Sequence, residues 1–91
     1  MELAAKAAGY NAFPGHAAQM MDSGWNPLTD DGDALRLAVK LDIGTDSNLS
    51  RVWAFSCTRD ICEEEEKGSD PVSATRRAIV RAAAEIGRAM P

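Results

Sequence analysis

The chain has 91 residues, of which 45% are hydrophobic and 26% are charged, and its formal net charge is −4. This length and composition predict one small globular domain over residues 1–91, with room for a single core. The acidic balance argues against a protein whose whole surface follows a phosphate backbone, and it is too small to indicate an acidic mimic of DNA.

The sequence also carries a prediction about location. No apolar stretch approaches the roughly 18 residues that cross a bilayer, so we expect no membrane partner. The N-terminal segment lacks the basic stretch and hydrophobic block that are typical of a secretion signal, which favours the cytoplasm. The two cysteines, Cys57 and Cys62, fit reduced thiols in that compartment better than a disulfide.

The N-terminal third predicts a helix, a hairpin and a loop. Helix formers fill residues 2–8, and Gly9 follows at the position where a left-handed residue ends many helices. Residues 10–21 alternate on either side of a Pro-Gly turn, which is typical of a hairpin. Residues 22–28 form the expected connecting loop, because the Asn-Pro step within them disfavours a helix.

A second helix is predicted over residues 30–41. Thr29 or Asp30 can cap its first N–H groups, and further carboxylates in the first turn suit the helix dipole. At about 100° per residue, apolar side chains cover more than half of its circumference. Such an arc is wider than one sheet face requires, so we expect contact with a sheet and with a second neighbour, either a helix or another subunit. The arc consists of Ala34, Leu35, Leu37, Ala38, Val39 and Leu41.

The next segments predict strands and a loop. Residues 42–48 favour a short strand and turn, and residues 50–58 alternate more clearly than any other part of the chain. Residues 62–70 are dominated by charge and are predicted to form a surface loop. The two faces of the strand over 50–58 are Val52, Ala54 and Ser56 against Trp53, Phe55 and Cys57, and Cys57 is expected to be buried beside the two aromatic residues.

The last helix is predicted over residues 71–90, with Asp70 as its N-cap and Pro71 in its first position. It has an apolar side and a basic side. The order α-β-β-α-β-β-α predicts an α+β fold, in which an antiparallel sheet of three or four strands is packed by three helices. The apolar side consists of Val72, Ile79, Ala82, Ala83, Ile86 and Met90, and the basic side of Arg77, Arg81 and Arg88 with Arg76 at its edge.

Two segments resemble a known family. WNPLTDDGDALRLAVKL (25–41) and ATRRAIVRAAAEIGRAM (74–90), which together make up about a third of the chain, are similar to small proteins of tailed bacteriophages and prophages, the phage ABA sandwich domain family. The resemblance implies a sandwich of the α/β/α type, a phage or prophage origin and the cytoplasm of a bacterial host. It assigns no activity and no site, because the family has no established function and no assigned catalytic residues.

The acidic cluster at the start of the second helix has two interpretations. Asp30, Asp31 and Asp33 offer the oxygen ligands that a hard cation takes, but a calcium loop spreads its ligands over about a dozen residues. Here they lie within one helical turn, where capping and dipole compensation account for all three. We therefore expect these aspartates to begin the helix, without a metal.

The residue types of transition-metal or nucleophilic chemistry do not form a pattern. His16, Cys57 and Cys62 lack an evident fourth ligand, and the C-x4-C spacing is longer than that of a zinc knuckle. A catalytic serine or cysteine would need a base and an orienting group, which nothing in the sequence favours. The prediction is a protein with no catalytic residues, no metal and no cofactor.

Two features suggest interaction surfaces. The arginine face, which consists of Arg76, Arg77, Arg81 and Arg88, suits phosphates or an acidic protein, unless residues 63–66 or Glu85 balance it as an ordinary solvated face. Trp25 and the wide apolar arc suggest protein association, including a possible homodimer, unless the domain buries them internally. We expect a non-enzymatic accessory protein that binds a host or phage protein, with nucleic-acid binding as the alternative.

Overall fold

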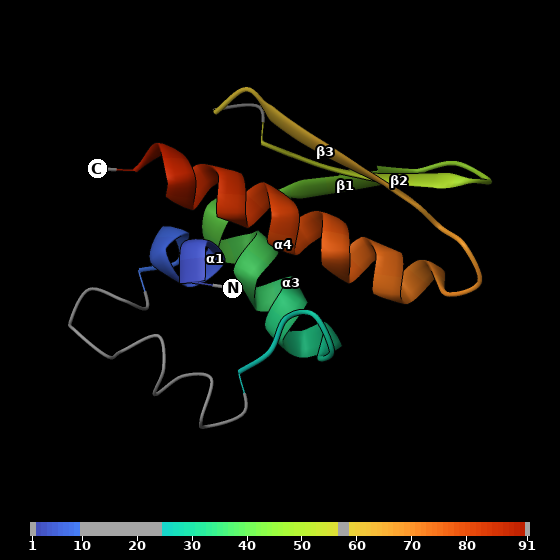
Figure 1. The fold of residues 1–91 in the computed structure, drawn as a ribbon, viewed down its shortest axis with the longest axis horizontal. Helices are drawn as coiled ribbons and strands as arrows, with labels where there is room; N and C mark the ends of the chain where they lie inside the picture. The colour runs from blue at the N-terminus through green and yellow to red at the C-terminus, as the bar shows by residue number, and fades with distance from the viewer. Residues whose placement is uncertain (1, 10–24, 57–58, 91) are drawn as a thin grey trace.

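A computed structural model of the chain describes residues 2–9, 25–56 and 59–90 (Figure 1). The three strands form one antiparallel sheet in the order β1-β2-β3, so the prediction of an α+β fold with three helices on an antiparallel sheet is confirmed. The hairpin predicted over residues 10–21 lies outside the described residues. The elements in chain order are α1 (Glu2–Ala7), α3 (Asp31–Leu41), β1 (Gly44–Ser47), β2 (Arg51–Ser56), β3 (Ile61–Glu66) and α4 (Pro71–Ala89).

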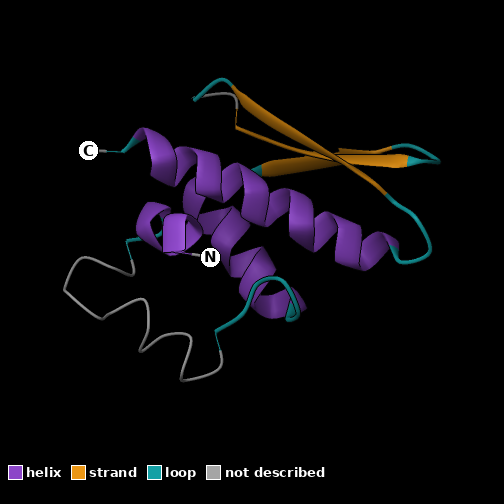
Figure 2. Cartoon of the chain, in the orientation of Figure 1, coloured by secondary structure: helices purple, strands orange, loops and turns teal. Residues whose placement is uncertain are grey.

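Helix α4 lies between the sheet and the other two helices. It packs on β2 and β3 and also on α1 and α3, and Figure 2 shows all three helices on the same side of the sheet. Of the two neighbours predicted for the second helix, the neighbouring helix is confirmed, since α3 packs chiefly on α4. The described layers therefore run from the sheet through α4 to α1 and α3, and no described helix covers the opposite face of the sheet.

Small side chains allow α1 and α4 to approach closely. Ala4, Ala5 and Ala8 of the first segment are 0–1% exposed, and they lie against a helix that is itself rich in buried alanine. At Gly87 the two backbones almost touch, because a Cβ atom there would lie 1.9 Å from the carbonyl oxygen of Leu3. A short helix is marginal in isolation, so this packing is what stabilises α1.

The apolar arc of α3 is only partly covered. Leu37 is fully buried and Leu41 is 4% exposed, as expected of residues that face α4. Leu35 and Val39 are 64% and 69% exposed, so the described residues leave one side of the arc in solvent.

Helix α4 is buried more widely than its predicted apolar side. Ile79 and Ile86 are buried as predicted, and Val80 is buried as well because α4 packs on two sides. Val72 and Met90, which were expected in the apolar side, are 53% and 39% exposed, because they lie at the two ends of the helix, where packing is incomplete.

Strand β3 forms where the sequence predicted a charged loop. Glutamate has a low strand propensity, yet Ile61–Glu66 pair with β2 along their whole length. Alternate glutamates point to opposite faces of the sheet, and each set meets arginines: Glu63 and Glu65 those of α4, Glu64 and Glu66 the side chain of Arg51. These ion pairs stabilise the glutamates within the strand. Strand propensity, which considers each residue type alone, does not include them.

A matched pair of leucines on α3 tests its orientation. Leu37→Ala removes a fully buried side chain and should lower the free energy of unfolding by about 2–5 kcal/mol. Leu35→Ala, on the same helix but exposed, should change it by less than about 0.5 kcal/mol. Urea denaturation measures both values, and equal effects of the two substitutions would contradict the orientation of α3.

Gly87→Ala tests the close approach of α1 to α4. Alanine favours an isolated helix by about 1 kcal/mol over glycine, but here the added methyl group would collide with the backbone of Leu3. We expect a net loss of about 1–3 kcal/mol of stability and a displaced α1, measured by thermal unfolding and amide exchange of residues 3–8. The neighbouring exposed substitution Arg88→Ala should leave amide exchange in α1 unchanged, and a stabilising Gly87→Ala would show that α1 does not pack there.

Candidate functional site

The first-turn carboxylates of α3 are engaged by the chain itself. Asp30 is the N-cap and accepts the backbone N–H of Asp33 at 2.8 Å. Asp33 is buried and accepts the backbone N–H of Asn26 at 2.8 Å and a guanidinium N–H of Arg36 at 2.6 Å. The Asn26 hydrogen bond, against the opposing effect of burial and with help from Arg36, holds the pKa of Asp33 below its ordinary value. The prediction that these aspartates begin the helix is confirmed.

No metal-ligand cluster is found within residues 2–9, 25–56 and 59–90. Histidine, cysteine and acidic side chains do not form a group of three there that could hold an ion. Cys62 is free and exposed, whereas His16 and Cys57 fall outside the described ranges. In the same ranges, no helix is long and apolar enough to cross a membrane.

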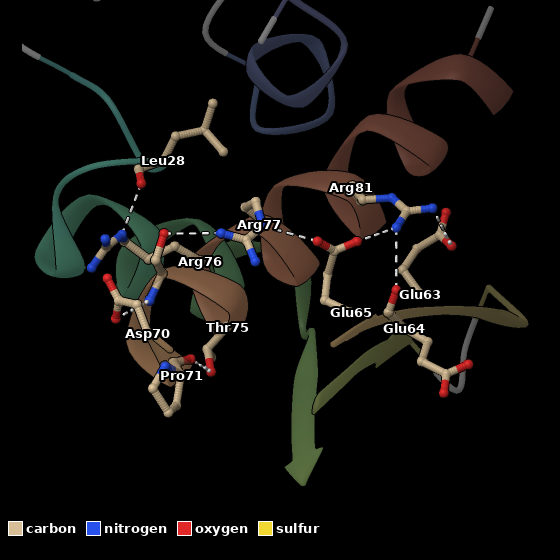
Figure 3. A network of polar contacts seen from close by, with 11 residues as sticks. Leu28, Glu63, Glu64, Glu65, Asp70, Pro71, Thr75, Arg76, Arg77 and Arg81 are labelled. Atoms are coloured by element: carbon tan, nitrogen blue, oxygen red, sulfur yellow. Dashed lines mark hydrogen bonds and ion pairs between the residues drawn. The ribbon is translucent and has the colours of Figure 1, made fainter. Parts of the chain in front are cut away.

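Three residues of the arginine face, Arg76, Arg77 and Arg81, are tied to neighbouring elements by ion pairs, and Figure 3 shows these three side chains. Arg76 donates to the carbonyl oxygen of Leu28 at 2.8 Å and pairs with Asp31 at the start of α3. Arg88 pairs with Glu85 one turn earlier on α4, at 2.8 Å. The ends of the predicted basic surface therefore have carboxylate partners.

The centre of the arginine face is paired with β3. Arg77 and Arg81 both bind the carboxylate of Glu65, which Figure 3 shows between them. Arg81 also contacts Glu63 at 3.8 Å and donates to the carbonyl oxygen of Glu64 at 3.2 Å. Arg76, Arg77 and Arg81 thus hold α4 against α3 and β3, whereas Arg88 pairs within α4. The interpretation that residues 63–66 and Glu85 balance the arginine face agrees with this geometry.

The electrostatic effect of this pairing is centred on Glu65. Its side chain is 18% exposed. The hydrogen bond from Arg77, with further help from Arg81, outweighs desolvation and lowers the pKa of Glu65 below its ordinary value of 4.5. Glu65 in turn raises the pKa of Arg81. The pair therefore stays ionised at neutral pH.

Trp25 does not lie with the arginines on a surface. It is 6% exposed and belongs to the hydrophobic core. Because its indole is buried, Trp25 contributes to stability and not to an exposed interaction surface, which corrects the expectation placed on it. Of the residues predicted for the two interaction surfaces, the four arginines lie on the surface of α4 and Trp25 lies in the core.

An apolar hollow of about 290 Å³ lies between α3, α4 and β1. Leu35 and Val72, both exposed, line it together with Thr45 and Ile79. It adjoins the side of the arc that the described residues leave uncovered. The homodimer predicted through the apolar arc of residues 30–41 stays a prediction.

The face of the sheet turned away from α4 is a second candidate surface. On β2, Val52, Ala54 and Ser56 are buried, whereas Trp53 and Phe55 on the opposite face are only half-buried. We call that face, with its cross-strand partners, the outer sheet face. Its members are Gly44, Asp46, Arg51, Trp53, Phe55, Cys62, Glu64 and Glu66.

The register places acidic residues on both sides of Trp53. Asp46 on β1 and Glu64 on β3 are its direct cross-strand partners, and both are exposed. Directly opposite residues of antiparallel strands have Cβ atoms about 5 Å apart, so both carboxylates lie within reach of the indole. This row of acid, indole and acid runs across all three strands.

The neighbouring cross-strand row consists of Gly44, Phe55 and Cys62. Phe55 is its central residue. Its ring covers Gly44, where a Cβ atom would lie 2.9 Å from the ring. The partner on the other side is Cys62, which is small and exposed. Alternation along residues 50–58 predicted which residues share this face, but the sequence did not show that α4, α3 and α1 would all lie on the other side.

Known proteins add no assignment to either surface. Comparisons of the chain with protein-family models, with curated proteins and with solved structures each found no match. The resemblance to the phage ABA sandwich domain family therefore stays a prediction.

The ion pairs of Glu65 predict a pH dependence of stability. Because folding lowers the pKa of Glu65, its contribution is present above pH 4.5 and is lost as the pH falls through the lower, folded-state value. At neutral pH, Glu65→Gln should cost about 1 kcal/mol, since both arginines are about half exposed. The difference from the parent should disappear in acid.

Denaturation with urea across the acidic pH range measures this effect. Glu66→Gln removes the same charge from the same strand, at a side chain that is 78% exposed. It should preserve the parental pH dependence. A Glu65→Gln variant with that same dependence would contradict the role of the carboxylate between Arg77 and Arg81.

Proposed function

We propose that this chain is a small, non-enzymatic accessory protein of phage or prophage origin. It acts in the cytoplasm of a bacterial host by binding a host or phage protein through the outer sheet face. The phage origin is supported by the resemblance of residues 25–41 and 74–90, and the mode of action by the geometry of the sheet.

One observation supports the outer sheet face as the binding surface. Trp53 and Phe55 stand two residues apart on the central strand, half-buried, on a face that no described helix covers. Tryptophan is enriched among residues that dominate binding energy, and aromatic side chains lose little conformational entropy on binding. A central strand paired on both sides also holds them rigidly.

The alternative is nucleic-acid binding by the arginine face of α4. The ion pairs of the arginine face support it less, because phosphates would have to replace the carboxylates that hold Arg76, Arg77 and Arg81 against α3 and β3, and the carboxylate of Glu85 beside Arg88. The net charge of −4 also disfavours an approach to a polyanion.

Site-specific photo-crosslinking in host lysate tests the proposal. A photo-reactive residue at position 62, on the outer sheet face, should form a discrete adduct with one protein that mass spectrometry identifies. An excess of unlabelled parent chain should compete the adduct away, and Trp53→Ala should reduce it at least about tenfold, since it removes a central aromatic anchor.

The same photo-reactive residue at position 35, exposed on α3, is the matched control and should not form this adduct. Melting temperatures of all variants establish that they are folded. An adduct that forms equally from position 35, or that survives Trp53→Ala in a folded chain, would overturn the outer sheet face as the binding surface.

A further inference from the structure

We infer that the partner segment received by the outer sheet face is cationic, with a lysine or arginine side chain placed over the indole of Trp53. This inference rests on the proposed function and names the chemistry of its partner. It is carried by the row formed by Asp46, Trp53 and Glu64.

The row offers two attractions to the same group. The face of an indole attracts a cation within about 6 Å of its centre, and tryptophan does so more strongly than the other aromatic residues. Asp46 and Glu64 lie on both sides of the indole, so a guanidinium or ammonium group above it would also meet a carboxylate. An anionic segment at the same place would meet like charges.

The two carboxylates differ in what already binds them. Glu64 is paired with Arg51 at 3.2 Å, and Arg51 also approaches Glu66 at 3.6 Å. Within the described ranges, Asp46 has no lysine or arginine partner and accepts the backbone N–H of Ser47 at 2.8 Å. The β1 side of Trp53 is therefore the side where a cation from a partner gains an uncompensated carboxylate.

The charge of the whole surface agrees with this placement. The outer sheet face carries three carboxylates and one guanidinium, which leaves a net charge of −2. On the opposite face of the same sheet, Glu63 and Glu65 are held by the arginines of α4. The negative charge that remains available to a partner on this sheet is thus concentrated around Trp53.

The surface is also fixed before binding. Phe55 packs over Gly44, and Trp53 stands on a strand whose backbone is paired on both sides. A preformed site loses less conformational entropy on binding than a loop that must become ordered. This geometry favours recognition of a single basic side chain in an exposed segment of the partner.

Peptide titrations of the isotope-labelled full chain, followed by NMR, test the inference. The probes are three synthetic peptides of equal length, in which glycine alternates with arginine, with glutamine or with glutamate. The arginine peptide should shift the indole N–H resonance of Trp53 and the amides of Asp46 and Glu64, more strongly at low salt. The glutamate and glutamine peptides should not.

Two substitutions locate the interaction. Trp53→Leu keeps an apolar side chain without the indole and should raise the Kd roughly threefold to tenfold. Asp46→Asn keeps an oxygen for the N–H of Ser47 and should raise the Kd about threefold. Glu85→Gln removes the same charge on α4 and should leave the Kd unchanged. Thermal unfolding confirms that each variant is folded.

The outcomes separate this inference from the proposed function. Equal shifts of the Trp53 face by the glutamine or glutamate peptide would overturn the cationic partner but not the binding surface. An arginine peptide that does not bind, that shifts α4 instead, or that binds Asp46→Asn as tightly as the parent would also overturn it. The proposed function itself fails if the crosslink at position 62 is absent, forms equally from position 35 or does not depend on Trp53.

Discussion

The fold depends on one helix that is buried on two sides. Helix α4 packs on the sheet and on both α1 and α3, and its small residues allow close approach, to the point that Gly87 has no room for a side chain against Leu3. A chain of this size has only enough apolar area for one core. Because all three described helices gather on the same side of the sheet, that core lies on one side, and none of the described helices covers the other face of the sheet.

The same arrangement explains the charges. Three arginines of α4 meet other elements, because one flank of the helix lies against β3 and another lies against the start of α3. Glu65 lies between Arg77 and Arg81, and Asp31 meets Arg76. These pairs stabilise a run of four glutamates as a strand. Three residues of the arginine face, Arg76, Arg77 and Arg81, make contacts between elements. Charge that looked like a surface signal in the sequence is largely structural.

The acidic and aromatic character of the outer sheet face follows from what α4 does not neutralise. Alternation along β3 sends Glu63 and Glu65 to the arginines, and Glu64 and Glu66 to the other face, beside Trp53. Arg51 compensates only part of this charge. The function proposed for the chain and the cationic partner inferred for it both arise from this unequal division of charge between the two faces of one sheet.

The sequence by itself determined the local elements, because each depends on neighbours along the chain. Asp30 and Asp70 cap their helices as predicted, Gly9 adopts a left-handed conformation, and Val52 and Ala54 share the buried face of β2. Only the tertiary structure decided that residues 61–66 form a strand, that Trp25 is buried, that Leu35 is exposed, and which side of the sheet is left uncovered. These outcomes depend on contacts between residues far apart in the chain, such as Arg77 with Glu65 and Gly87 with Leu3, which periodicity and propensity do not contain.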